Sequence, residues 1–306
     1  MLDLILAVVV NGVFRSEGSH RAEWTAVPPR VASRLNLLWR GTYQSMTHAP
    51  KAETDQSDRP RAMSQSLLTQ RTRAHYEQFP FIQGGDLRIQ AWARRLEANL
   101  PELTPGTAVL DVGCGSGEVA AACRSLSLEV CAIDLTAVAV TATHALNVPV
   151  CQGDALHLPF LDHSVDHVVA IGVLHHTPDC AEALSEAARV SRRTVIVLLY
   201  SKYTPYHLLY TLASPLRRRV DVSWLERVPK SVLLLARLSA RMLTGQTLDD
   251  DQLRRVIADQ FWTPQASFHT QREVVRWAGT LGLRLVRRRR YLGYSGLYVL
   301  RHLDAP

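Results

Sequence analysis

The sequence predicts an α/β fold built on a seven-stranded, mostly parallel sheet. Two observations predict it: short apolar runs alternate with helical periodicity between residues 105 and 203, and a glycine-rich turn follows the first of these runs. Strands that alternate with helices imply crossover connections and a parallel sheet covered on both faces. A chain of 306 residues with 47% apolar residues is long enough to bury one large core.

The expected elements divide residues 62–306 into four parts. Residues 62–104 hold two N-terminal cap helices, and residues 105–203 form a ligand-binding core. Residues 204–268, where the alternation stops, form a mainly helical lid insertion, and residues 269–306 form a C-terminal helix and two strands. The expected strands are 107–112, 128–134, 148–152, 165–171, 194–200, 284–291 and 296–302; the expected helices are 67–76, 87–100, 118–125, 137–146, 180–190 and 271–281.

Residues 1–61 are predicted to form a poorly ordered leader. An apolar run at 4–10 is too short to span a bilayer and follows Asp3 instead of basic residues. Residues 11–61 are rich in Ser, Thr, Pro and charge and show little periodicity. Met46 and Met63 are both alternative start positions.

The cysteine spacing and the net charge limit the kinds of site and partner that the protein can have. None of the five cysteines has metal-ligand spacing, so we expect reduced thiols in a cytoplasmic protein and no metal site. The net charge is +7, and residues 214–306 alone carry 17 Lys and Arg against 8 Asp and Glu. This basic surplus fits an anionic acceptor, nucleic acid or peripheral membrane contact, and it fits a solvated surface equally well.

The segment from Val109 to Gly117 is the most informative one. It reads as a buried strand that enters a glycine-rich turn and then a helix, and glycines at such a turn let the backbone approach a ligand. The residue after Gly117 is Glu118, so the spacing is GxGxG and differs from the GxGxxG of dinucleotide sites. The turn also lacks the lysine of a P-loop. The turn is therefore not built for a pyrophosphate.

Three carboxylates follow successive strands. Asp111 ends the first buried strand, Asp134 ends the second and Asp154 follows the third. A buried carboxylate without a partner costs several kcal/mol, so these side chains need cationic or hydrogen-bonding ligands. S-adenosylmethionine has a sulfonium, an ammonium and a ribose diol and lacks phosphate, so it suits this edge.

These motifs resemble those of class I S-adenosylmethionine-dependent methyltransferases. Residues 109–117 resemble motif I, residues 130–134 resemble the second motif, and residues 152–166 are similar to the "GDA-LPF-SFD" segment of the type 11 group. Residues 171–176 resemble that group's fourth-strand end, and residues 75–81 resemble its "YE-FPF" segment. The usual Pro-Gly-Gly turn before the fifth strand is replaced by residues 190–194, which puts the local connection in question more than the activity.

The resemblance implies a Rossmann-like sheet with an antiparallel last strand and a bound S-adenosyl-L-methionine. Asp134 would hold the ribose hydroxyls, Asp154 and Ala155 would flank the adenine, and Tyr76 would cover the cofactor. The full set of implied cofactor contacts is Asp111, Gly113, Cys114, Gly115, Gly117, Asp134, Leu135, Asp154, Ala155, Gly172, Val173 and Tyr76.

His175 is the candidate catalytic residue. Methyl transfer chiefly needs alignment, and a general base is needed only if the acceptor loses a proton. His175 is expected to open onto the transferred methyl and His176 to point away. The alternative is that His175 only packs against the cofactor or caps a turn.

The acceptor is expected to be a small molecule or a lipid-like compound. Aromatic and histidine residues at both hinges of the lid would suit an apolar pocket or ordinary packing: Tyr203, Tyr206, His207, Tyr210, Phe261, Trp262, Phe268 and His269. Residues 231–243 form a basic amphipathic segment that could lie on a membrane, and residues 217–219 and 287–290 could contact anions.

Three other functions compete with this one. A tRNA or RNA methyltransferase is favoured by the basic C-terminal third and weakened by the lack of an RNA-binding module. A non-catalytic partner protein with the same fold would have no need for glycines at residues 113 and 115. An NAD-dependent oxidoreductase is disfavoured by the loop spacing.

Overall fold

The computed structural model describes residues 59–81, 85–215, 227–228, 230–231, 233–234, 237, 249–291 and 293–305. Residues 1–58 of the predicted leader, the segment 217–219 and most of the amphipathic segment 231–243 lie outside these residues. The predicted leader boundary is three residues too late, because residues 59–61 already belong to a helix that begins at Arg59. Within them, no helix is long and apolar enough to cross a membrane, and no group of three or more His, Cys, Asp or Glu could hold a metal ion.

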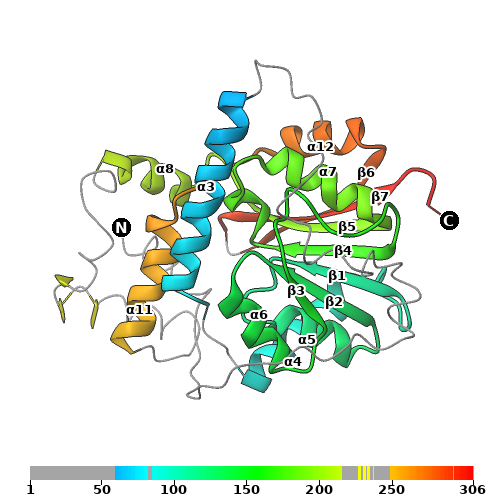
Figure 1. The fold of residues 1–306 in the computed structure, drawn as a ribbon, viewed down its shortest axis with the longest axis horizontal. Coiled ribbons are helices and arrows are strands. Elements are labelled where there is room, and N and C mark those ends of the chain that lie inside the picture. The colour runs from blue at the N-terminus through cyan, green and yellow to red at the C-terminus, as the bar shows by residue number, and fades with distance from the viewer. Residues whose placement is uncertain are drawn as a thin grey trace.

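A seven-stranded mixed sheet forms the centre of the protein (Figure 1). Its order is β3-β2-β1-β4-β5-β7-β6; the pairs from β3 to β5 are parallel, and β7 is antiparallel to both β5 and β6. The strands are β1 Ala108–Val112, β2 Glu129–Asp134, β3 Val150–Gln152, β4 Val165–Ile171, β5 Ser191–Tyr200, β6 Leu283–Tyr291 and β7 Ser295–His302. The predicted fold class is confirmed.

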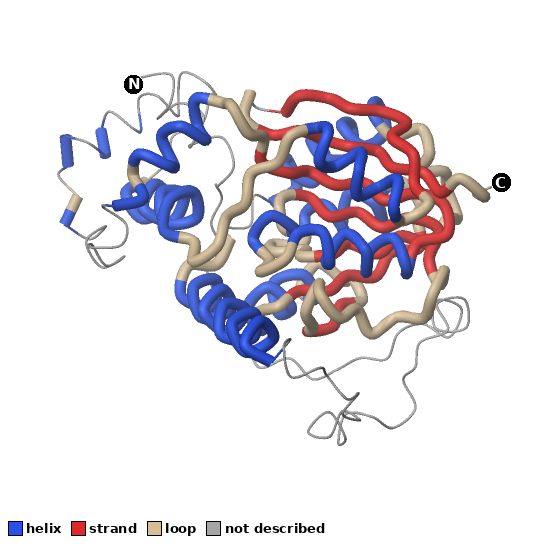
Figure 2. The backbone as a smooth tube through the Cα atoms, turned by 90° about the horizontal axis from the view of Figure 1, so that it is seen from above, coloured by secondary structure: helices blue, strands red, loops and turns tan. Residues whose placement is uncertain are grey.

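Helices cover both faces of this sheet, as Figures 1 and 2 show. One face packs against α7 Cys180–Val190 and α12 Gln271–Thr280 around a core that includes Leu184 and Val274. The other packs against α4 Gly85–Asn99 and α5 Glu118–Ser125 around Leu96 and Ala122. Helix α6 Ala137–His144 also lies beside the parallel strands. The apolar strands are therefore buried on both sides, as parallel strands require.

Among the described residues, four helices lie at the carboxyl edge of the parallel strands. They are α3 Arg59–Gln78, α8 Pro205–Leu212, α11 Asp250–Ile257 and the π-helical turn η4 Ala258–Trp262, which continues α11. Figure 1 shows α3, in blue, beside α11, in orange, although the two are far apart in the sequence. These helices close the edge of the sheet where the glycine-rich turn lies.

The connection between α7 and β5 differs from the expectation. Strand β5 was expected from residue 194, but it begins at Ser191, directly after the last residue of α7. A register irregularity between Val165 and His167 of the neighbouring β4 accommodates the extra residues. Arg192 and Arg193 are exposed there and face Asp166. The chain thus makes this junction without a Pro-Gly-Gly turn.

Candidate functional site

The turn after β1 has the backbone conformation that only glycine adopts easily. Gly113, Gly115 and Gly117 have φ angles of +69°, +53° and +81°. A Cβ atom on Gly113 would lie 2.2 Å from Cγ2 of Val173, and one on Gly117 would lie 2.8 Å from Oγ1 of Thr143. The turn is therefore pressed against the end of β4 on one side and α6 on the other.

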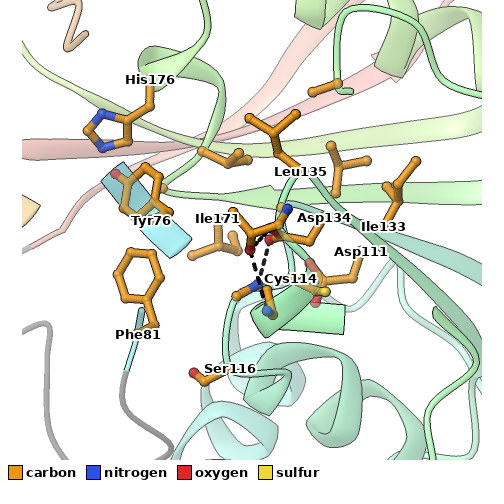
Figure 3. Close-up of a pocket in the computed structure, with 18 of the residues that line it drawn as sticks. Tyr76, Phe81, Asp111, Cys114, Ser116, Ile133, Asp134, Leu135, Ile171 and His176 are labelled. Atoms are coloured by element: carbon orange, nitrogen blue, oxygen red, sulfur yellow. Dashed lines mark hydrogen bonds between the residues drawn. The ribbon is translucent and has the colours of Figure 1, made fainter. Parts of the chain in front are cut away.

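Asp134 holds this turn to β2. One carboxylate oxygen accepts a hydrogen bond from the Gly115 amide at 2.9 Å, and the other accepts from the amide and the hydroxyl of Thr136, both at 2.9 Å. Burial raises the pKa of Asp134, and these donors oppose that effect. Figure 3 shows Asp134 among the residues that line a pocket.

Asp111 lies beneath the turn and is buried. Burial raises its pKa to about 7, and the nearby charge of Asp134 adds to this effect. Its Oδ2 atom is buried and has no hydrogen-bond partner among the residues that the structure describes. A buried carboxylate oxygen of this kind is costly unless a ligand satisfies it.

The pocket around these carboxylates collects most of the expected cofactor residues. Of these, the following line it: Tyr76, Asp111, Gly113, Cys114, Gly115, Asp134, Leu135, Asp154, Ala155, Gly172 and Val173. Gly117 does not line the pocket; it precedes α5 and makes room for Thr143 instead. Close packing against Thr143 thus explains why a glycine occupies position 117.

The two histidines after β4 are exchanged relative to the expectation. His175 is fully buried, its ring lies 3.8 Å from that of Tyr200, and it does not line the pocket. Burial lowers its pKa well below the usual value, and the nearby His176 adds to this effect. His176 lines the pocket instead. The orientation predicted for the pair is wrong because Gly172, with φ +78°, ends the strand and a 3-10 turn follows.

A wall of aromatic rings and one lid carboxylate complete the pocket. Tyr76 stacks on Phe81 with ring centroids 5.5 Å apart and meets the edge of His176 at 6.0 Å (Figure 3). The Tyr76 hydroxyl donates to Oδ1 of Asp259 at 3.2 Å. Asp259 therefore joins the lid to the cap helix α3 across the pocket.

Sequence reasoning missed Phe81, His176, Tyr200 and Asp259 as pocket residues. Phe81 belongs to the same "YE-FPF" segment as Tyr76, so this segment could have indicated that Phe81 also lies at the pocket. Asp259 offered a weaker one, since it stands between residues whose spacing predicts a buried helix face, Val256 and Gln260. Nothing in the sequence tied it to residues more than 180 positions earlier.

Most of the lid-hinge aromatics pack against one another instead of lining the pocket. Tyr206, Tyr210 and Phe268 form a cluster with Tyr200 and Tyr294, and Phe261 packs against it. The Tyr206 hydroxyl donates to the backbone carbonyl of Gln260 at 2.7 Å. Tyr203 is 86% exposed. The cluster anchors the lid to the ends of β5 and β7.

Residues 110–199 match the family model of a methyltransferase domain. "Probable tRNA methyltransferase 9B" of Bos taurus is 35% identical over 111 residues, which cover 34% of this chain and 23% of that protein. A "Probable S-adenosylmethionine-dependent methyltransferase" of Mycolicibacterium smegmatis is 28% identical over 195 residues, or 57% of this chain and 75% of that protein.

Among solved structures, magnesium protoporphyrin IX methyltransferase from Synechocystis PCC 6803 with bound SAH is similar with a TM-score of 0.48. It shares 14% identity, and the match covers 79% of this chain and 99% of that one. The chain spans about a quarter of the length of the first curated relatives it matches.

Proposed function

We propose that this protein is a class I S-adenosylmethionine-dependent methyltransferase acting on a small-molecule or lipid-like acceptor, because residues 110–199 match the methyltransferase-domain family model. The single observation that carries this function is the pocket lined by Asp134, whose carboxylate accepts a hydrogen bond from the Gly115 amide of the glycine turn.

The chemistry of the pocket fits S-adenosylmethionine. The buried Oδ2 of Asp111 needs a hydrogen-bond donor or a cation, and the cofactor has an ammonium and a sulfonium. The turn has no lysine and lacks the third glycine position of a dinucleotide site, so it offers nothing for a phosphate. The close approach of Gly113 to Val173 leaves no room for a side chain at the turn.

We assign the cofactor contacts to the pocket residues named above. Asp134 would hold the ribose hydroxyls, Asp154 and Ala155 the adenine, and Asp111, Gly113 and Gly172 the methionine part. When bound, S-adenosylmethionine supplies a methyl group that its sulfonium has made electrophilic. The protein would contribute alignment, and Tyr76, Phe81 and Asp259, which line the pocket, would help to exclude water from it.

Calorimetric titration with S-adenosylmethionine and S-adenosylhomocysteine tests this function. Replacing Asp134 by Asn removes a charged acceptor worth about 1.5–3 kcal/mol, so affinity should fall roughly 10- to 100-fold. The matched control is Asp162→Asn, an exposed aspartate that pairs with Arg189 outside the pocket, and it should bind like the wild type. If the wild type binds neither compound, the function is wrong and a non-catalytic partner protein becomes the better hypothesis.

A tRNA or RNA acceptor is the second candidate. It is supported by the name of one relative and by exposed arginines on β6, Arg284 and residues 288–290. Phosphate contacts make binding fall steeply with salt, so tRNA affinity should drop at least tenfold between 50 and 200 mM salt if this candidate is right. No binding at 50 mM salt would remove it.

A further inference from the structure

Three polar side chains from distant parts of the chain meet at one end of the pocket. Tyr76 comes from α3, His176 from the 3-10 turn after β4, and Asp259 from the π-helical turn of the lid. All three line the pocket. This π-helical turn follows α11 directly and ends the helix; π-helical turns are rare and frequently occur at functional sites.

The structure fixes which nitrogen of His176 carries the hydrogen. Nδ1 lies 2.8 Å from the backbone carbonyl oxygen of Gln265. A carbonyl oxygen can only accept, so Nδ1 must donate its hydrogen. In the neutral ring Nε2 then has a free lone pair and can accept a proton.

As a carboxylate, Asp259 offers only acceptor positions to a ligand; burial raises its pKa, and the nearby His176 and the hydrogen bonds from Gln260 and Tyr76 oppose this effect. Its Oδ1 receives the Tyr76 hydroxyl at 3.2 Å, and its Oδ2 receives the side-chain amide of Gln260 at 3.0 Å. Since the Tyr76 hydrogen is already given to Asp259, the three side chains together present lone pairs and no donor. A ligand atom that bears a hydrogen is complementary to such a site.

We infer that His176, held in place by the Gln265 carbonyl and with the Asp259 carboxylate in the same pocket, is the general base that removes the proton from a hydroxyl acceptor carried on a planar, apolar framework. This inference rests on the proposed methyltransferase function. The stacked rings of Tyr76 and Phe81 and the buried ring of Tyr200 line the same pocket and suit a flat aromatic acceptor such as a phenol.

The proposed step is a methyl transfer coupled to loss of the hydroxyl proton. The acceptor oxygen would form a bond to the methyl carbon as the carbon–sulfur bond breaks, and the electron pair of that bond would stay on sulfur. The hydroxyl proton passes to Nε2 of His176. The imidazolium that results keeps its Nδ1 bond to Gln265 and is stabilised by the charge of Asp259.

Ionisable groups on every side of His176 set its protonation. Burial lowers its pKa, and Asp259 opposes this effect. His175 and His75 are close enough for His176 to lower their own pKa values, and the Tyr76 pKa is raised well above its usual value. His176 is therefore neutral at pH 7, as a base must be, and Tyr76 keeps its hydrogen.

Nitrogen NMR of the histidine-labelled protein with S-adenosylhomocysteine tests the tautomer directly. We expect His176, assigned with His176→Asn, to carry hydrogen on Nδ1 alone at pH 7.5 and to titrate below 6.5. In Asp259→Asn the pKa should fall further, because the charge that favours the imidazolium is gone. Hydrogen on Nε2, or a charged ring at pH 7.5, overturns the inference. The same spectra without the ligand report the tautomer even if calorimetry shows no cofactor binding.

Two probe acceptors separate base catalysis from alignment. Phenol must lose a proton as it is methylated, whereas iodide has none to lose. We expect His176→Asn to lower the ratio of the phenol rate to the iodide rate at least 100-fold, the usual contribution of a general base, and the exposed His157→Asn to leave that ratio at the wild-type value.

The wild-type phenol rate should rise with pH through the His176 pKa, and Asp259→Asn should move this rise to lower pH. If the ratio of the phenol rate to the iodide rate is unchanged in His176→Asn, His176 is not the general base. If the wild type methylates iodide but not phenol, the proposed acceptor class is wrong. Failure of both reactions together with failure to bind S-adenosylhomocysteine counts against the methyltransferase function instead.

Discussion

Replacing Gly113 by alanine should destabilise the protein by about 2–5 kcal/mol. An alanine at φ +69° costs about 1–2 kcal/mol because of its left-handed backbone. Its Cβ would lie 2.2 Å from Val173 Cγ2, and overpacking of this kind costs about 1–3 kcal/mol more. The sum of the two effects gives the expected loss.

Gly106 provides a matched control for the backbone contribution. It has a similar φ of +79°, but a Cβ there would meet nothing within 4 Å. Gly106→Ala should therefore cost only about 1–2 kcal/mol. In the double variant Gly113→Ala/Val173→Gly the clash with the residue 173 side chain, including its Cβ at 2.6 Å, disappears, so the two substitutions should couple by about 1–3 kcal/mol.

Urea unfolding of these variants measures the free energies, and calorimetry with S-adenosylhomocysteine measures the accompanying loss of affinity. Equal costs for Gly113→Ala and Gly106→Ala, with no coupling to Val173, would refute the reasoning. The turn would then tolerate a side chain, and the close approach between the turn and β4 would have no energetic weight.

Three further predictions concern the parts that frame the pocket. Thr270→Ala removes the capping box at the start of α12 and should lower the free energy of unfolding by about 1 kcal/mol in urea. Tyr206→Phe should cost about 1–3 kcal/mol, because the buried carbonyl of Gln260 loses its donor at the π-helical turn; differential scanning calorimetry would detect this loss, and an unchanged melting temperature would argue against it. Burial lowers the pKa of His167 from 6.5 to about 4, so the folded state resists protonation of this residue. The free energy of unfolding should therefore be highest above pH 6.5 and should fall as the pH drops from 6.5 towards 4. Urea titrations at several pH values should show a shallower fall across that window in His167→Gln.

Most of the sheet could be predicted because each strand is a short apolar run between clear breaks. The five parallel strands lie within two or three residues of their expected bounds, and helices α5 and α7 match theirs. Periodicity carries this information, since burial on both faces requires an uninterrupted apolar segment. The glycine turn was equally readable because its φ angles leave little choice of residue.

The orientation of the two histidines could not be read in the same way. Strand alternation would place His175 and His176 on opposite sides, and it predicts the wrong one for the pocket. The positive φ of Gly172 breaks the alternation, and the following 3-10 turn has a period of about three residues. Which glycine makes such a break depends on packing that a single sequence does not display.

Asp259 was missed because its role depends on a contact between remote segments. The residues around it predict an ordinary lid helix, and only the change to π-helical geometry aims the carboxylate at Tyr76. Local propensity does not specify a π-helical turn, since it is favoured by the surrounding contacts. Tertiary packing thus determined this part of the site.

The arginines of β6 bear on how the protein behaves at high concentration. Strand β6 is the outermost strand of the described sheet, and its exposed side chains include Arg284 and residues 288–290. An outer strand with free backbone groups can pair with another copy of itself, and a row of like charges opposes this pairing. In 1 M salt, where the Debye length is only about 3 Å, this repulsion is screened and self-association through β6 should increase. The arginines of β6 would therefore oppose self-association at low salt and lose this effect at high salt.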